Sequence, residues 1–173
     1  KLSAKEIKLD IDEHNLSELI DISTRIFVPI AREKKINFTI QKIETDKFKL
    51  RDAKRLSKII QNLINNSIKF TDVQGFVKCI FEVNEDNLLI SIEDNGKGIP
   101  KKDLQNIFKR FYQVKSKDYL TYPGTGIGLS MVKEYVELMG GEISLKSELG
   151  IGTNFRLKLD LKSPNAQNIM SSP

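Results

Sequence analysis

The chain has 173 residues, of which 39% are hydrophobic and 29% charged, and its formal net charge is +5. These values fit a soluble globular protein of one domain, with enough apolar side chains for a core. One cysteine and one histidine, His14, argue against a disulfide framework and against a zinc site. Basic and acidic residues are interleaved, so the positive charge predicts solvated helix faces and not a nucleic-acid interface.

The first predicted element is a helix that runs through LSELIDISTRIFVPIAREKK. Asn15 or Ser17 can cap it, because a side-chain oxygen at the start of a helix accepts from the free N–H groups there. Pro29 lies within this helix and predicts a kink or a boundary. The apolar stripe that we expect to face the core comprises Leu16, Leu19, Ile20, Ile26 and Ile30.

The middle of the chain alternates between strand and helix patterns. INFTIQKI alternates like a strand, and Asp52 can cap a second helix, AKRLSKIIQNLINNSIKF. Two strands, GFVKCIFEV and NLLISIED, follow and are joined by the turn-rich NEDN. Cys79 is expected to be buried in the first of them. The residues of the second helix that we expect to face the sheet are Leu56, Ile59, Ile60, Leu63 and Ile64.

The last third of the chain begins with the glycine-rich loop NGKGIP, a predicted short helix KKDLQNIFKRF and the polar loop YQVKSKDYLTYPG. A third long helix is expected from Thr125 to the Gly140-Gly141 pair, which is typical of a C-cap. EISLKSELGIGTNFRLKLDL then predicts a hairpin. This order of elements predicts an α+β two-layer sandwich, in which a mixed, mostly antiparallel sheet packs against three helices.

The stretch TYPGTGIGLS places Gly124, Gly126 and Gly128 directly before the third helix. The start of a helix offers free N–H groups and a positive dipole end, which favour a phosphate, and glycine lets the backbone approach a ligand closely. The alternative is a loop that only turns the chain.

Two further stretches carry polar residues with two possible roles each. Asn62, Asn66 and Lys69 fall on one face of the second helix, where they can bind a hard cation and a phosphate, or can form a solvated surface. Asp94 ends a strand in front of the glycines of EDNGKGIP. Its carboxylate can accept a hydrogen bond from an amino group, or can belong to an ordinary turn.

In this order and spacing, the motifs resemble those of the catalytic, ATP-binding domain of sensor histidine kinases. That domain belongs to a superfamily with DNA gyrase, heat-shock chaperone and mismatch-repair ATPases. NLINNSIKFT is similar to the N box of the family, EDNGKGIP to the G1 box, IFKRFYQV to the F box and GTGIGLS to the G2 box. ELGIGTNF fits the closing, G3-like hairpin. The resemblance runs from about Ile11 to Leu161.

The resemblance implies the Bergerat ATP-binding fold, with a mobile ATP lid from Tyr112 to Pro123. It also implies three segments of chain. Residues 13–162 would form the catalytic domain, residues 1–12 the tail of a helical dimerisation domain that carries the phosphoacceptor, and residues 163–173 a flexible tail.

Roles in ATP binding follow from the resemblance. Asp94 would accept a hydrogen bond from the adenine amino group, Asn66 would hold Mg²⁺ through its amide oxygen, and Lys69 would meet phosphate oxygens. Thr153 would reach adenine through water. The residues expected to bind ATP are Asn62, Asn66, Lys69, Phe70, Asp94, Gly96, Gly98, Ile99, Tyr112, Gly124, Thr125, Gly126, Ile127, Gly128, Leu129 and Thr153. Those expected to act in catalysis are Asn62, Lys69 and Arg110.

Two positions bear on the reaction. Hydrolytic relatives carry a glutamate at the place of Asn62 as a general base for water, and an amide cannot take up that proton. Asn62 therefore favours phosphoryl transfer to histidine over hydrolysis. Gln113 stands where many members of the family have an arginine that contacts the γ-phosphate. Its absence leaves Arg110, Lys115 or Lys117 as substitutes, or a slower reaction.

The resemblance implies an enzyme, the catalytic fragment of an ATP-dependent protein histidine kinase. It would use ATP and Mg²⁺ to phosphorylate a histidine on a separate dimerisation domain of the same parent protein, because His14 does not match the acceptor motif. A response-regulator receiver domain would act downstream. The isolated fragment is expected to be monomeric and cytoplasmic. A membrane-anchored parent protein would be compatible with this expectation. The alternative is a nucleotide-binding regulatory module that has lost efficient transfer, and a hydrolytic ATPase is disfavoured.

Overall fold

The computed structural model describes residues 14–42, 49–50, 52–115 and 124–161. The expected dimerisation-domain tail (1–12) and C-terminal tail (163–173) lie outside these residues, and so does most of the expected lid. Within the described part of the chain, no helix is both long enough and apolar enough to cross a membrane.

A five-stranded mixed sheet forms one layer, in the order β2-β4-β5-β7-β6. Only β2 and β4 pair in parallel, and the other neighbours are antiparallel. The strands are β2 (Asn37–Lys42), β4 (Phe76–Asn84), β5 (Asn87–Asp94), β6 (Glu142–Glu148) and β7 (Gly152–Asp160). Two short strands, β1 (His14–Asn15) and β3 (Lys49–Leu50), form a separate antiparallel pair that the sequence did not predict.

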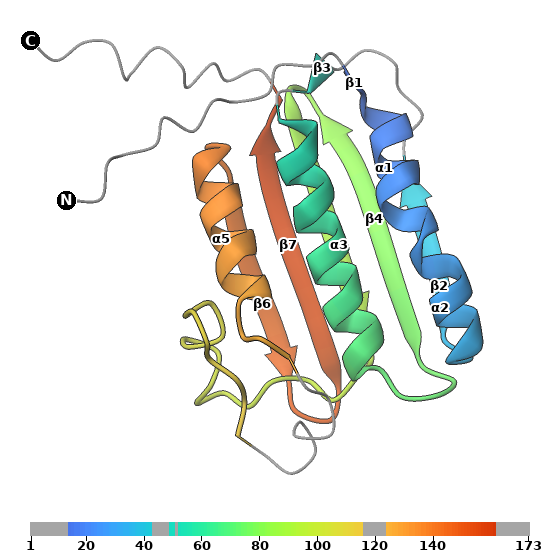
Figure 1. Cartoon of the computed structure of the whole chain (residues 1–173), viewed down its shortest axis with the longest axis vertical. Coiled ribbons are helices and arrows are strands. Elements are labelled where there is room, and N and C mark those ends of the chain that lie inside the picture. Colours follow the sequence, from blue (N-terminus) through green and yellow to red (C-terminus); the bar gives the residue numbers. More distant parts are fainter. Residues whose placement is uncertain (1–13, 43–48, 51, 116–123, 162–173) are drawn as a thin grey trace, which may run out of the picture.

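The helices lie together on one face of the sheet (Figure 1). They are α1 (Leu16–Arg25), α2 (Phe27–Glu33), α3 (Ala53–Phe70) and α5 (Gly128–Leu138). Both predicted caps are confirmed, since Asn15 Oδ1 accepts from Ser17 N at 2.8 Å and the Asp52 side chain accepts from Arg55 N. This arrangement confirms the expected two-layer α+β sandwich.

The first predicted helix is two helices, because the chain breaks at Ile26, ahead of Pro29. A proline ring clashes with the carbonyl four residues earlier, which here belongs to the last residue of α1. The break also changes the buried face, so that Phe27 and Ala31 pack inward. Ile26 and Ile30 remain 51% and 44% exposed, and their assignment to the core is wrong.

Two further expectations are corrected. Residues 101–111 form successive turns and not a helix, with bonds such as Asn106 N to Asp103 O that span three residues. Phe111, at the end of these turns, has a φ of 65° and donates its N–H to Gly126 O, which draws the segment away from a helical path. α5 begins at Gly128 and not near Thr125, because Gly126 has a φ of 70°, outside the right-handed helical region.

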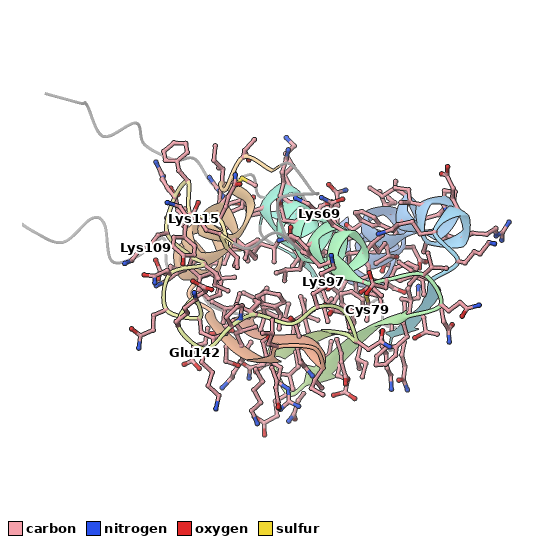
Figure 2. The ribbon with its side chains drawn as sticks, turned by 90° about the horizontal axis from the view of Figure 1, so that it is seen from below. Lys69, Cys79, Lys97, Lys109, Lys115 and Glu142 are labelled. Carbon is pink, nitrogen blue, oxygen red and sulfur yellow. The ribbon has the colours of Figure 1, made fainter. Side chains whose placement is uncertain are left out.

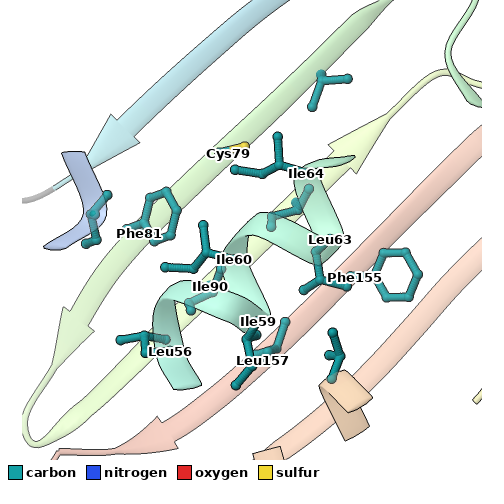
Figure 3. Packing of buried hydrophobic residues seen from close by; sticks show 14 of the residues in the cluster. Leu56, Ile59, Ile60, Leu63, Ile64, Cys79, Phe81, Ile90, Phe155 and Leu157 are labelled. Atoms are coloured by element: carbon teal, nitrogen blue, oxygen red, sulfur yellow. The ribbon is translucent and has the colours of Figure 1, made fainter. Parts of the chain in front are cut away.

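The core lies between α3 and the centre of the sheet (Figure 3). The five residues of α3 predicted to face the sheet are fully buried. They pack within one apolar cluster that also includes Cys79, Phe81, Ile90, Phe155 and Leu157. Cys79 is 0% exposed, which confirms its predicted burial. Because one face of α3 is fixed in this way, its remaining side chains must point elsewhere.

Lys34, just after α2, binds the C-terminal end of α3. Its Nζ donates to Ile68 O at 2.6 Å and to Lys69 O and Thr71 O at 3.3 Å. The last carbonyls of a helix have no partner within the helix, and a cation at this end also interacts favourably with the helix dipole. Lys34 therefore fixes the end of α3 from outside the helix.

We expect Lys34→Met to lower the free energy of unfolding by about 2 kcal/mol, because charge-assisted hydrogen bonds to partly buried carbonyls are lost. Urea denaturation would measure it. The matched control is Lys58→Met, since Lys58 is exposed on the surface of α3. Equal losses in the two variants would contradict the capping role.

Candidate functional site

A cavity of about 780 Å³ lies at the end of the sandwich where α3 ends and α5 begins. This volume lies within the range of small-molecule sites. Figure 2 views this end from below and shows Lys69 on the α3 side and Lys115 across from it. The predicted site residues that line the cavity are Asn62, Asn66, Lys69, Phe70, Asp94, Gly98, Ile99, Tyr112, Gly124, Thr125, Gly126, Gly128, Leu129 and Thr153.

Three predicted site residues are not among the lining residues: Gly96, Ile127 and Arg110. Arg110 is instead paired with Glu134 of α5, with 2.9 Å between Nη2 and Oε2. Gly96 lies against the end of α3, where an added Cβ would come within 2.5 Å of the carbonyl oxygen of Phe70.

The cavity also has lining residues that the sequence did not single out. They are Asn65, Ser67, Ile107, Phe111, Val114 and Phe155, and the cavity is also lined by Gln113 and Lys115, which the sequence singled out only in relation to the γ-phosphate. Asn65 lies in the same asparagine-rich run as the predicted residues, so this run could have indicated that Asn65 also lines the site. Ile107 and Phe155 are buried apolar residues. The sequence does not distinguish apolar residues that line a cavity from apolar residues of the core.

The polar face of α3 presents amide oxygens to the cavity. Asn62 Nδ2 donates to Lys58 O at 2.8 Å, which leaves Oδ1 directed toward the glycine loop. A Cβ at Gly128 would lie 2.9 Å from this Oδ1, so the missing side chain leaves it open. The side chain of Asn66 lines the same cavity and makes no hydrogen bond to another described residue. These oxygens are therefore available to a ligand.

Lys69 brings a positive charge to the same wall. Its Nζ lies 5.0 Å from the centre of the Phe70 ring, and a Cβ at Gly124 would come within 2.9 Å of it. Burial lowers the pKa of the Lys69 ammonium below its usual value. An anion in the cavity would offset this cost, because an opposite charge favours the charged form.

Asp94 closes the inner end of the cavity and is only 6% exposed. Its Oδ1 accepts from Gly96 N at 3.0 Å. Burial raises the pKa of the Asp94 carboxyl, and the backbone N–H groups of Gly96 and Thr153 oppose that rise. The Ser67 hydroxyl approaches the carboxylate, but it lacks the geometry of a hydrogen bond to any described residue. A donor from a ligand would stabilise this poorly solvated charge.

The loop after Asp94 is held tightly between α3 and the β6–β7 hairpin. Lys97 N donates to Phe70 O at 3.1 Å, and Gly150 N donates to Lys97 O at 2.8 Å. Gly98 has a φ of 67°, and an added Cβ there would come within 1.8 Å of Glu148 O. The packing of protein backbone, and not only the approach of a ligand, therefore requires glycine at this position.

Gln113 lies at the cavity wall, and its side-chain amide donates to the carbonyl of Gly124. The bond joins the two stretches of described chain on either side of residues 116–123. Lys115 is the other cation among the described lining residues besides Lys69. The structure thus assigns Gln113 a contact within the protein and leaves two lysines beside the cavity.

Comparisons with known proteins identify the family of this chain. The sequence model of the family described as "Histidine kinase-, DNA gyrase B-, and HSP90-like ATPase" matches residues 51–163. The chain is 36% identical over 170 residues to hybrid signal transduction histidine kinase D of Dictyostelium discoideum, and this match covers 95% of the chain and 11% of that relative. It is 34% identical over 176 residues to sensor histidine kinase TmoS of Ectopseudomonas mendocina, covering 99% of the chain and 18% of that relative. The chain therefore spans less than a fifth of the length of either relative.

A solved structure has the same architecture. The catalytic domain of histidine kinase ThkA superposes with a TM-score of 0.73 at 25% identity, covering 90% of this chain and 97% of that one.

The raised pKa of Asp94 predicts a pH effect on stability. Between the ordinary value of 3.8 and the raised value, the folded state holds a proton that the unfolded state has lost. Stability should therefore fall as pH rises through this window, and Asp94→Asn should remove that part of the pH dependence.

Urea denaturation at a series of pH values measures this effect. Glu142→Gln is the control, because Glu142 is exposed on β6. A difference profile between wild type and Asp94→Asn that is flat across the window would contradict the prediction.

Proposed function

This chain belongs to the histidine kinase-, DNA gyrase B- and HSP90-like ATPase family and is similar to the catalytic domain of sensor histidine kinases, and on this basis we propose its function. The chain binds ATP in the cavity and phosphorylates histidine. The γ-phosphoryl group would pass to a histidine on a dimerisation domain of the same parent protein. The observation that carries the proposal is the convergence of Asp94, the amide face of α3 and the glycine loop on one cavity.

The two ends of the cavity suit the two ends of a nucleotide. Asp94, at the buried end, would accept a hydrogen bond from the amino group of adenine, and the apolar side chains of Ile107 and Phe155 form walls for a base. Lys69 Nζ lies beside Gly124, in the glycine loop that leads to the N-terminus of α5, where positive charge and free N–H groups favour phosphates. This polarity supports a purine triphosphate and not a neutral ligand.

The residues present fit a magnesium ion. Mg²⁺ in nucleotide sites takes one or two protein oxygens together with phosphate oxygens and water. Asn66 would hold it through its amide oxygen, and Asn62 Oδ1 faces the same space. When bound, the ion would neutralise charge that develops on the phosphates.

The reaction would need little from the protein beyond positioning and charge. The lone pair of the acceptor imidazole attacks the γ-phosphorus, the bond from that phosphorus to the β,γ-bridging oxygen breaks, and ADP leaves with the electron pair. Lys69 and Lys115 would stabilise negative charge at this end. Lys115 would act in place of Arg110, whose guanidinium group is paired with Glu134 in this structure.

Asn62 determines which nucleophile the site can use. Its Nδ2 is committed to Lys58 O, and an amide oxygen does not accept a proton at neutral pH. Water needs a general base, whereas imidazole already carries a free lone pair. The site therefore favours transfer to histidine over hydrolysis.

The remaining partners follow from the same proposal. A receiver domain of a response regulator would take the phosphoryl group from the histidine, as part of the two-component pathway in which sensor histidine kinases act. The domain would work in the cytoplasm, where ATP is present.

The test combines binding and transfer. Titration with an ATP analogue, with and without Mg²⁺, should show Mg²⁺-dependent affinity. Asp94→Asn should lose about 1.5–3 kcal/mol of binding free energy, the value of a hydrogen bond to a charged group. Glu93→Gln, on the same strand but outside the cavity lining, should bind as wild type does.

Addition of the histidine-bearing dimerisation domain in trans should then give acid-labile phosphohistidine. Tight binding without transfer would favour the alternative of a regulatory nucleotide-binding module, for which the engagement of Gln113 with Gly124 is the supporting observation. Unchanged affinity in Asp94→Asn would remove the adenine assignment.

We expect that Asn62→Glu does not raise histidine phosphorylation, because the imidazole needs no base. The measurement is the initial rate of phosphohistidine formation, with ATP hydrolysis followed in parallel. Gln61→Glu places the same charge on α3 beside the cavity lining and is the control. A several-fold faster phosphorylation in Asn62→Glu alone would count against the positioning role.

A further inference from the structure

Ser147 of β6 lies behind the cavity wall and joins three parts of the site. Its Oγ accepts from the backbone N–H of Ile99 at 2.8 Å. It also lies 2.9 Å from the carbonyl oxygen of Gly152 and 2.9 Å from the hydroxyl oxygen of Thr153. Ile99 and Thr153 both line the cavity, whereas Ser147 does not.

The direction of these bonds follows from a count of protons. A serine hydroxyl has one proton to donate and lone pairs to accept. The carbonyl oxygen of Gly152 can only accept, so a 2.9 Å contact with it is a hydrogen bond only if the Ser147 proton lies there. The Thr153 hydroxyl must then be the donor in its own contact with Ser147. In the opposite arrangement, two oxygen atoms would face each other at 2.9 Å without a proton.

This direction fixes what Thr153 offers to a ligand. With its proton committed to Ser147, Thr153 Oγ1 presents only lone pairs to the cavity. Thr153 pairs with Asp94 across β5 and β7, and each is less than 10% exposed. The ionised carboxylate of Asp94 also only accepts. Apart from the hydroxyl of Ser67, the groups that Asp94 and Thr153 present to this part of the cavity are therefore acceptors.

From this geometry we infer that Ser147 is a positioning residue that sets base specificity by holding Thr153 as an acceptor, so that a purine with an amino group is preferred over one with a carbonyl oxygen at the same place. The inference rests on the proposed nucleotide function. An oxo-purine would place its oxygen against the oxygens of Asp94 and Thr153, and buried polar atoms without partners reduce affinity. When Ser147 is absent, the Thr153 hydroxyl is free to rotate and donate to that oxygen.

The experiment compares the affinities of ADP and IDP, which differ in the amino or oxo group of the base and in the proton that the oxo base carries on N1, at constant Mg²⁺. Wild type should prefer ADP. Ser147→Ala should lower the ratio of the two affinities about threefold to tenfold, the range of one hydrogen bond, through a relative gain for IDP. Ser147→Thr keeps the hydroxyl and should keep the wild-type ratio.

A double-mutant cycle separates positioning from general damage to the fold. If Ser147 acts through the Thr153 hydroxyl, Ser147→Ala should change the ratio in the wild-type background but not in the Thr153→Val background. Equal loss of affinity for ADP and IDP in Ser147→Ala would overturn the inference and leave the proposed function intact. Failure of wild type to bind either nucleotide would overturn both.

Discussion

The packing of α3 against the centre of the sheet is the contact on which the remaining structure depends. Leu56, Ile60 and Ile64 are fully buried in the apolar cluster between α3 and the sheet (Figure 3). An 18-residue helix fixed along one face has no freedom to rotate about its axis. The amides that point away from the sheet are therefore held in place by apolar contacts that they do not make themselves. The same core thus gives the domain its stability and gives the cavity its polar wall.

Around this helix, the loops are fixed by backbone contacts more than by side chains. The loop after β5 donates to the end of α3 and accepts from the β6–β7 hairpin, through Phe70, Lys97 and Gly150. The turns at residues 101–111 are tied to the glycine loop by the bond from Phe111 N to Gly126 O. Backbone bonds of this kind tolerate many side chains but few changes in length. The shape of the cavity is accordingly a property of the loop lengths and of the glycines that allow close approach.

The sequence was sufficient to predict the order of the elements, the layer architecture and most of the cavity lining. These features depend on periodic burial and on local motifs, both of which can be read along the chain. The exposure of Ile26 and Ile30 could not be predicted, because the break before Pro29 changes which residues of α2 face the core. The hydrophobic pattern along the chain does not contain this change of direction. The turns near Phe111 depend on a partner in the glycine loop, which is distant in sequence. The ion pair of Arg110 with Glu134 could not be predicted for the same reason, since it forms only in the fold.

Lys34 has a consequence for the electrostatics of the whole cavity. α3 ends and α5 begins at the same end of the sandwich (Figure 1), so a polyanion in the cavity would meet one unfavourable and one favourable helix terminus. The ammonium group of Lys34 covers the carbonyls of Ile68, Lys69 and Thr71. It thereby masks the partial negative charge at the one terminus that would repel phosphate, while the opposing terminus stays uncovered. A lysine that belongs to neither helix thus reduces the repulsion of an anion at one helix terminus and leaves the attraction at the other terminus in place.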